Sequence, residues 1–400
     1  MSLFGFELRK LLFNKRTLLI AAAMAVVYAA IGFGTSYFLV GSGEAYKTYS
    51  ALAAPVTGPL DARKADEALQ SYEALKDRFG DNPEMIYYGT SSDPVLKFDV
   101  DYANYTGYVN EYHNGAASDS LSAPYGVNVL RGKLTELARD GKTNTFEYRS
   151  VKNQLDKETA LGEPRFANTV EWGNLFTNWG DTLMLFVLFI PLAFIISSVF
   201  SREASTGMDN LILSSRNGRR KIVTAKIGAV AVTAAILLGI YLLATFGFGF
   251  LAVGTLEGWD AALRSVPAYV RAPFGFTNLQ FTLVSALWVL LSGTVYALVV
   301  AFISSRLKSQ MAALGVSLLV LFLNIGIAAL GTGIQSALQW LSDFGVASFA
   351  LVGEVFAGYK VYNVFGFPVP YYGALLVFMG AVIALASLGM YIGQRRRTVA

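Results

Sequence analysis

Residues 201–226, SREASTGMDNLILSSRNGRRKIVTAK, lie between two wholly apolar segments and decide how the chain is folded. Six of these 26 residues are Lys or Arg, and only Glu203 and Asp209 are acidic. A basic segment between two apolar ones is typical of the cytoplasmic face of a membrane protein, because Lys and Arg bias short loops to that side. We call residues 201–226 the connector.

The composition also points to the membrane: 54% of the 400 residues are hydrophobic, and only 15% are charged. Six segments approach or exceed the roughly 20 apolar residues that a bilayer crossing needs. None contains Lys, Arg, Asp or Glu, each of which would cost about 2.5–3.5 kcal/mol at the bilayer centre. The sequence therefore predicts an α-helical, polytopic membrane protein with six transmembrane helices: Leu18–Val40, Thr182–Phe200, Ile227–Gly254, Leu279–Ser304, Gln310–Gly331 and Tyr372–Gly393.

Basic residues also gather beside other spans, between Arg9 and Arg16, at Arg306 and Lys308, and at Arg395–Arg397. Both termini and the connector are therefore predicted to be cytoplasmic. The first apolar segment is longer than the 7–15 residues of a signal peptide core, which indicates an anchor. Because the basic residues are split among membrane flanks, nucleic-acid binding is not expected.

The chain divides at these spans. Residues 1–17 are predicted to form a cytoplasmic amphipathic helix, 18–40 the first span, and 180–400 the other five spans. The insert, residues 41–179, is predicted to be an extracellular, mainly α domain without disulfides, since the chain has no cysteine. Helices are expected in it at Asp61–Phe79, Val127–Asp140 and Thr145–Leu161. Four tyrosines could stack on a ligand or pack internally: Tyr102, Tyr105, Tyr108 and Tyr112.

The residues needed for catalysis inside a membrane are missing from the sequence. His113 is the one histidine, no span holds an aspartate, and a zinc site is not expected. Gly141-Lys142-Thr143 resembles the tail of an ATP-binding loop, but Glu136 occupies the position of its first glycine. No catalytic residue, metal or cofactor is therefore predicted in this chain, and any ATP hydrolysis belongs to another polypeptide.

The connector is the first of three candidate functional features. Met208, Leu211 and Ile212 follow helical spacing and form an apolar stripe after Gly207. Residues 214–218, SSRNG, predict a turn, and Arg219–Lys221 are expected at the lipid headgroups. A short helix held between two spans either transmits force from a cytoplasmic partner or lies on the lipid without one, and spacing leaves both possibilities open.

The second feature is the N-terminal segment. Its apolar residues recur at helical spacing, while Glu7, Lys10 and Asn14 gather on another face. This pattern predicts an interfacial helix that anchors the chain to membrane lipid through Phe4, Leu8, Leu11 and Leu12.

The third feature is a set of polar or small residues within spans. Asn324 lies in the fifth span, and Ser292, Thr294 and Tyr296 lie in the fourth. Ala231 and Ala235 form a small-xxx-small pair in the third. Such residues more often join helices than bind cargo.

Three stretches resemble the permeases of ABC-2 type transporters. Glu203, Gly207 and LILSSRNGRRKIVTAKI (Leu211–Ile227) are similar to that family's connector. ELRKLLFNKRTLLI (Glu7–Ile20) is similar to its N-terminal helix. YNVFGFPVPYY (Tyr362–Tyr372) is similar to sequences before the last span in the permeases of Gram-positive bacteria, a branch with a large extracellular insert after the first span. The resemblance does not cover Gly41–Trp179.

This resemblance implies the permease subunit of an ABC exporter. Such a subunit pairs with a second permease, as a homo- or heterodimer, and binds a cytoplasmic ATPase subunit that carries ATP and Mg. Its coupling residues would be Glu203, Gly207, Met208, Leu211 and Arg219. The apolar spans favour an amphiphilic or peptide- or lipid-like substrate. The alternative is a non-transporting membrane receptor or scaffold, whose extracellular domain binds an envelope ligand.

Overall fold

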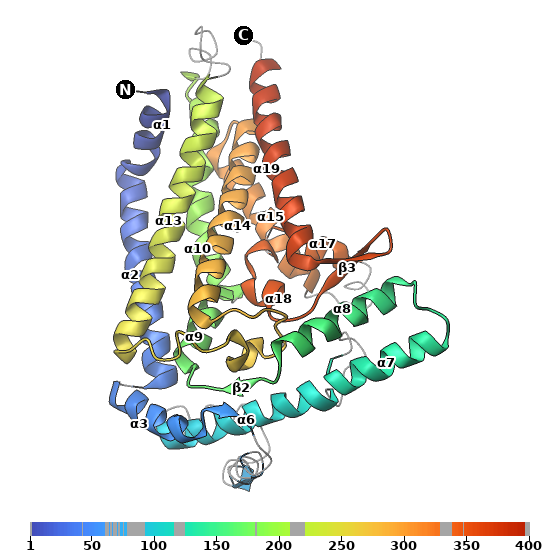
Figure 1. The fold of residues 1–400 in the computed structure, drawn as a ribbon. Coiled ribbons are helices and arrows are strands. Elements are labelled where there is room, and N and C mark those ends of the chain that lie inside the picture. Colours follow the sequence, from blue (N-terminus) through green and yellow to red (C-terminus); the bar gives the residue numbers. More distant parts are fainter. Residues whose placement is uncertain are drawn as a thin grey trace.

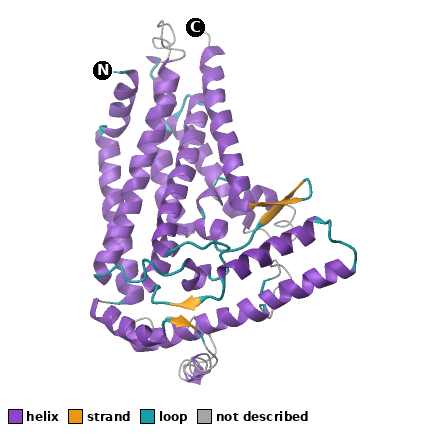
Figure 2. Cartoon of the chain, in the orientation of Figure 1, coloured by secondary structure: helices purple, strands orange, loops and turns teal. Residues whose placement is uncertain are grey.

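The computed structural model describes residues 2–41, 43–60, 93–115, 125–180, 182–208, 221–328, 338–346 and 348–396, with a few single residues and pairs between 64 and 77. Helices make up most of these residues, and strands form two small two-stranded sheets (Figure 2). The predicted helix Asp61–Phe79 lies largely outside the described residues, as does the connector from Asp209 to Arg220.

Five described helical segments are long and apolar enough to cross a membrane. They form a bundle of α2 (Lys15–Val40), α10 (Thr182–Ile196) continued by α11 (Ser198–Ser205), α13 (Lys221–Val253), α14 (Asn278–Arg306) and α19 (Tyr371–Arg396) (Figure 1). The fifth predicted span corresponds to α15 (Gln310–Ala328). Its described apolar part, Gln310–Leu323, is shorter than the others, and residues 329–337 lie outside the described residues. A sixth crossing therefore stays a prediction.

The second crossing is broken near the connector, where a continuous helix ending at Phe200 was expected. Pro191 lies inside α10, and a turn at Ser197 separates α10 from α11. Ser304 of α14 stabilises this break, because its Oγ donates to the Ser197 carbonyl at 2.6 Å and accepts from the amides of Phe200 and Ser201 at 3.2 and 3.1 Å. These contacts satisfy backbone groups that a helix start leaves without partners.

The insert is mainly helical where the structure describes it. Its elements are α3 (Gly43–Ala53), β1 (Gly58–Pro59), α6 (Pro94–Asn114), α7 (Val127–Arg139), α8 (Phe146–Leu161), β2 (Arg165–Phe166) and α9 (Val170–Gly180). The predicted helices Val127–Asp140 and Thr145–Leu161 are confirmed as α7 and α8. The strands β1 and β2 pair antiparallel and hold the two ends of the insert together. In Figure 1 the long helices α6, α7 and α8 lie across the end of the bundle opposite the termini.

The tyrosines of the insert are mostly packing residues. Tyr102 and Tyr105 lie edge-on to Phe166 in a buried aromatic cluster, with ring centroids 4.9 and 5.4 Å away. The Tyr112 side chain is buried as well, and its hydroxyl donates to the Glu158 carbonyl at 3.3 Å. Tyr108 is the exception and lines a cavity described below.

The insert shares its core with the bundle. The predicted boundary at Trp179 falls inside α9, whose residues Trp172, Phe176 and Trp179 are buried in the same hydrophobic cluster as the spans. The Trp179 indole donates to Thr245 of α13 at 2.8 Å, and Tyr241 of α13 donates to the Asn178 carbonyl at 2.6 Å. Helix α9 is therefore fixed to α13 by both apolar and polar contacts.

The loop between α13 and α14 fastens the insert further. Arg264 pairs with Glu158 of α8 at 2.8 Å, and Arg271 pairs with Glu111 of α6. After α15 come α17 (Gln339–Asp343), α18 (Val352–Phe356) and the antiparallel hairpin β3 (Val361–Val364) and β4 (Phe367–Pro370). Arg149 of α8 donates to the Gly366 carbonyl in this hairpin at 2.9 Å. Two loops of the membrane part thus hold the insert.

Candidate functional site

The N-terminal helix α1 (Leu3–Leu12) and the following helix α2 each begin at a side-chain cap. Ser2 accepts a hydrogen bond from the Gly5 amide at 3.1 Å, and Asn14 starts α2 by accepting from the Arg16 amide at 3.1 Å. Short polar side chains satisfy the free amides of a helix start in this way. Helix α1 therefore stands as a separate element directly before α2, and it packs along α13 (Figure 1).

The face that α1 buries differs from the expected one. Leu11, which was predicted to anchor in lipid, is buried in the core of the bundle. Leu8 and Leu12 are half-buried, and the Phe4 side chain is 39% exposed with its ring close to Gly228 of α13. Glu7, which the helical spacing put on the polar face, is only 2% exposed. The division into an apolar lipid side and a polar water side is thus wrong for α1, because its glutamate meets a cation on α13.

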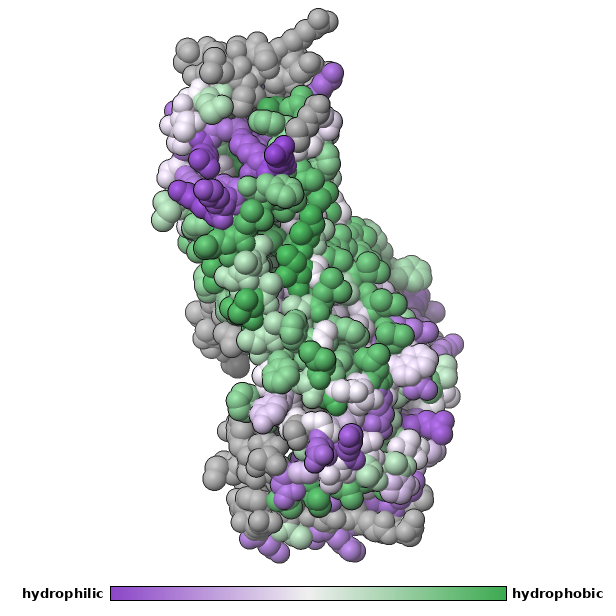
Figure 3. Space-filling view, turned by 90° about the vertical axis from the view of Figure 1, so that its left-hand side faces the viewer, coloured by the Kyte–Doolittle hydropathy of each residue, from purple (hydrophilic) through white to green (hydrophobic). Residues whose placement is uncertain are grey.

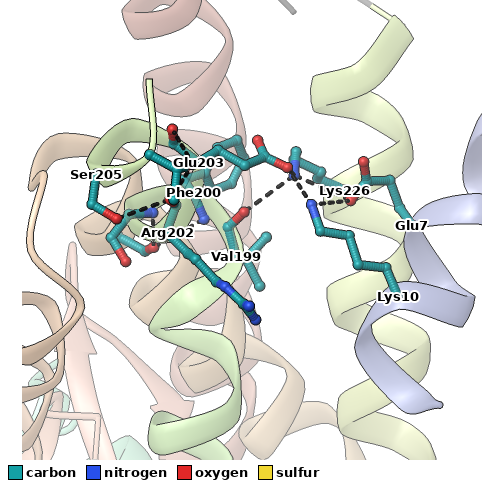
Figure 4. Close-up of polar contacts among 11 residues, drawn as sticks. Glu7, Lys10, Val199, Phe200, Arg202, Glu203, Ser205 and Lys226 are labelled. Atoms are coloured by element: carbon teal, nitrogen blue, oxygen red, sulfur yellow. Dashed lines mark hydrogen bonds and ion pairs between the residues drawn. The ribbon is translucent and has the colours of Figure 1, made fainter. Parts of the chain in front are cut away.

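A buried charge network joins three helices at the connector end of the bundle (Figure 4). The Lys226 ammonium of α13 donates to Glu7 Oε2 of α1 at 3.1 Å, to Glu203 Oε1 of α11 at 2.7 Å, and to the Val199 carbonyl at 3.1 Å. Lys10 of α1 also donates to Glu203, and its ammonium lies 3.9 Å from Glu7. We call Glu7, Lys10, Glu203 and Lys226 the charge network.

Burial makes the geometry of this network specific. Lys226 is 1% exposed and Glu203 is 7% exposed, and the Lys226 ammonium also lies 5.2 Å from the ring centre of Phe200. Removing an ion from water costs several kcal/mol, which is offset only if each charge is paired and hydrogen-bonded. Two carboxylates face two ammonium groups here, so the four charges balance. The network therefore favours one arrangement of α1, α11 and α13.

The predicted coupling residues occupy different environments. Glu203 lies in the last turn of α11 with its carboxylate turned inward to Lys226. Gly207 has φ of 71°, a left-handed conformation that glycine adopts without strain, and ends α11. Met208 is 53% exposed. Leu211, Ile212 and Arg219 lie outside the described residues.

Sequence reasoning missed Lys226. The third span was expected to begin at Ile227, which left Lys226 on the connector, but α13 begins at Lys221. A span prediction that ends at the first charged residue does not reveal that Lys226 pairs with carboxylates of two other helices. The available signal was a lone lysine at the start of an apolar span, which favours an inward-facing ion pair.

The polar residues predicted within spans serve packing where they are described. Ser292 and Thr294 donate to carbonyls of their own helix at 3.1 and 2.7 Å, and Tyr296 donates to the Ser317 carbonyl of α15 at 3.3 Å. The Asn324 side chain lies outside the described residues.

Of the small residues Ala231 and Ala235, Ala235 is exposed and so is not packed within the bundle. A close contact with the backbone of α13 occurs instead at Gly32 of α2, where an added Cβ would lie 2.7 Å from the Thr245 carbonyl oxygen.

A second buried carboxylate lies at the insert end of the bundle. Glu171 of α9 is 3% exposed and accepts hydrogen bonds from Ser36 at 2.6 Å and Asn174 at 3.5 Å. No described residue pairs with it as a cation. Burial raises the pKa of Glu171 to about 7, and the hydrogen bonds from Ser36 and Asn174 lower it less.

Glu171→Gln should therefore change how stability depends on pH. The folded-state pKa of Glu171 lies above its ordinary value of 4.5, so the folded wild-type protein binds a proton that the unfolded chain has released. The stability that the protonated Glu171 contributes to the wild type is complete below about pH 4.5 and is lost as the pH rises through 7. At pH 8 the variant should be more stable than the wild type by about 3 kcal/mol, at 1.36 kcal/mol per pKa unit. Unfolding curves of both proteins between pH 5 and 8 measure this, and parallel pH profiles would contradict it.

The described residues contain no group of three or more His, Cys, Asp or Glu that could hold a metal ion. Apolar spans, a buried ion network at one end and a helical insert at the other define a multi-pass membrane protein.

The family model described as ABC-2 family transporter protein matches residues 1–344. The chain belongs to this family, and it is the permease component of an ABC transporter, a class that works with an ABC ATPase subunit. No curated protein and no solved structure matches the chain.

Proposed function

We propose that this permease is the membrane subunit of an exporter and moves an amphiphilic or peptide- or lipid-like substrate out of the cell. A separate cytoplasmic subunit binds ATP and Mg, and a second permease completes the translocation path as a homo- or heterodimer. One observation carries the mechanical part of this proposal: Glu203, near the start of the connector, is tied by Lys226 to α13 and α1.

The charge network explains how force would pass from the connector to the spans. An ATPase that pushes on the connector moves α11, which ends at Ser205 shortly before Gly207. Glu203 then displaces Lys226 of α13 and, through it, Glu7 of α1, because breaking either pair would leave a buried charge. Glu203 is thus a positioning residue behind the docking surface, while the exposed Met208 is a candidate for direct contact with the ATPase.

The proposed orientation rests on charge. The connector, the N-terminal helix and the C-terminus carry most of the basic residues beside the spans, which supports a cytoplasmic location for both termini. The insert, with α3 and α6–α9, would then be extracellular. Export as the direction and an amphiphile as the substrate rest on the resemblance of the connector to exporter permeases and on the apolar character of the bundle.

Met208→Glu tests the contact with the ATPase. Placing a charge at an apolar docking position should lower the amount of ATPase that co-purifies from native membranes by roughly tenfold, as expected for a central interface residue. Trp259→Glu is the matched control, because Trp259 is 51% exposed but lies in the loop at the opposite end of the bundle. Equal ATPase recovery with Met208→Glu and wild type would exclude this docking position.

A receptor or scaffold is the second candidate, and one cavity favours it. A space of about 280 Å³ lies between α6, α9 and the loop after α13, lined by Tyr49, Tyr108, Phe166 and Thr169 among others. Its partly aromatic lining suits a small amphiphilic ligand. Vesicles with purified permease and ATPase discriminate the two functions: ATP-dependent movement of a substrate supports the exporter, whereas ligand binding without any transport supports the receptor.

A further inference from the structure

A cavity lies beside the charge network, on the side where α1 and the start of α2 face α10 and α11. Its volume is about 500 Å³. The wall is mostly apolar and includes Phe6, Leu11, Ile195 and Val199, while Lys10 and Arg202 contribute cationic side chains. A cavity of this size accommodates part of a small amphiphile.

The charge around this cavity is positive once the network is taken into account. Glu7 and Glu203 are matched by Lys10 and Lys226, so they do not neutralise Arg202. Among the residues that the structure describes, no carboxylate pairs with Arg202, and its side chain extends away from Lys226 (Figure 4). A smaller hollow of about 30 Å³ shares Arg202, Thr17 and Ser198 with the cavity and adds Arg16. We call the cavity and the hollow together the recess; Arg16 and Arg202 both line it.

The recess lies where the surface changes from apolar to polar. Figure 3, which views the molecule from the side of α1 and α2, shows hydrophilic residues gathered above a broad hydrophobic belt. The smaller hollow is also lined by Ile20 and Phe194, which belong to the apolar spans α2 and α10. A cationic recess that continues onto lipid-facing apolar side chains matches the depth of a phospholipid headgroup and the first part of its acyl chains.

We propose that this recess binds an anionic phospholipid of the surrounding membrane. Arg202 and Arg16 hold the phosphate by charge-assisted hydrogen bonds, and the acyl chains run along Ile20, Phe194 and Ile195. Since α1 and α11 both form its walls, the lipid contacts the same two helices that the charge network joins. The inference rests on the proposed function in placing this end of the bundle at the cytoplasmic leaflet.

The test is native mass spectrometry of the full chain in detergent, titrated with dioleoyl phosphatidylglycerol. Arg202→Gln should weaken binding about fivefold, and Arg16→Gln with Arg202→Gln about twenty-five-fold, since one basic residue contributes about 1 kcal/mol near an anionic membrane surface. Arg9→Gln is the matched control, because Arg9 is exposed on α1 but does not line the recess. Binding by this control should equal that of the wild type.

Two further arms identify the ligand class. Dioleoyl phosphatidylcholine should bind more weakly than phosphatidylglycerol to the wild type and should not respond to Arg202→Gln. Inorganic phosphate at millimolar concentration should not displace the lipid; full displacement would assign the recess to free phosphate and overturn the proposal. Equal phosphatidylglycerol binding by wild type and both variants would overturn it too. No ATPase is present, so failure of the exporter proposal appears separately, as absent transport with lipid binding intact.

Discussion

Replacing Lys226 by methionine should destabilise the permease by about 3–5 kcal/mol, the penalty for leaving a buried charge unpaired. The change removes the cation that lies 3.1 Å from Glu7 and 2.7 Å from Glu203. Only Lys10 would remain for the two carboxylates, and its side chain is 41% exposed. The free energy of unfolding, measured by denaturant titration of the purified chain in detergent, gives the size of the effect.

The matched control for this prediction is a variant without the buried charges. Combining Lys226→Met with Glu7→Gln and Glu203→Gln keeps an unbranched side chain at position 226 and removes the unpaired carboxylates. This triple variant should recover to within about 1 kcal/mol of the wild type, because neutral replacements of buried ion networks are often tolerated. The rate at which the partner ATPase hydrolyses ATP in complex with this triple variant should nevertheless fall if the network transmits force. A single Lys226→Met variant as stable as the wild type would show that the network carries no burial penalty.

Arg264→Met should have a comparable effect at the other end of the bundle. Arg264 donates to Glu158 at 2.8 Å and to the carbonyls of Val270 and Gly162 at 2.9 and 3.0 Å. Both charged side chains are almost fully buried, at 5% and 1% exposed. The variant should lose about 3–5 kcal/mol, since Glu158 would keep its burial without its partner.

The pH dependence separates this mechanism from loss of packing. Burial raises the pKa of Glu158, and Arg264 lowers it. Without the arginine the pKa rises further, so Arg264→Met should be most damaging above that pKa and less so at lower pH, where the carboxyl is protonated. The matched control is Lys133→Met, whose ion pairs with Glu136 and Glu147 are exposed and should contribute less than about 1 kcal/mol. An equal loss at pH 5 and pH 8 for Arg264→Met would point to packing instead.

The spans could be predicted from sequence because absence of charge over about 20 residues has one main explanation. Their ends could not. Helix α13 starts at Lys221 and so continues past Lys226, the first charged residue beyond the predicted span, whereas α14 extends up to and includes Arg306. Backbone hydrogen bonding does not stop at a charge if the side chain reaches water or finds a partner, and Lys226 finds Glu7 and Glu203. Hydropathy describes each side chain by itself, so it does not indicate where backbone hydrogen bonding ends a helix.

The site was predictable in part. Helical spacing indicated α1, and the connector pattern singled out Glu203, yet neither reveals that Glu7 and Lys226, 219 positions apart, form one ion pair. The loop between α13 and α14 shows the same limit. Arg264 and Arg271 share their loop with Glu257 and Asp260, but their partners are Glu158 and Glu111 of the insert. Long-range pairing is decided by packing, which single-chain patterns do not encode.

The hydroxyl of Ser304 has a mechanical consequence. It accepts from two amides at the start of α11 and donates to the carbonyl where α10 ends. The break in the second crossing is therefore held by a side chain of a neighbouring helix, Ser304 of α14. If the second crossing bends at this break while these hydrogen bonds are kept, α14 must move with it. A displacement applied at the connector therefore moves two crossings together and not the second crossing alone.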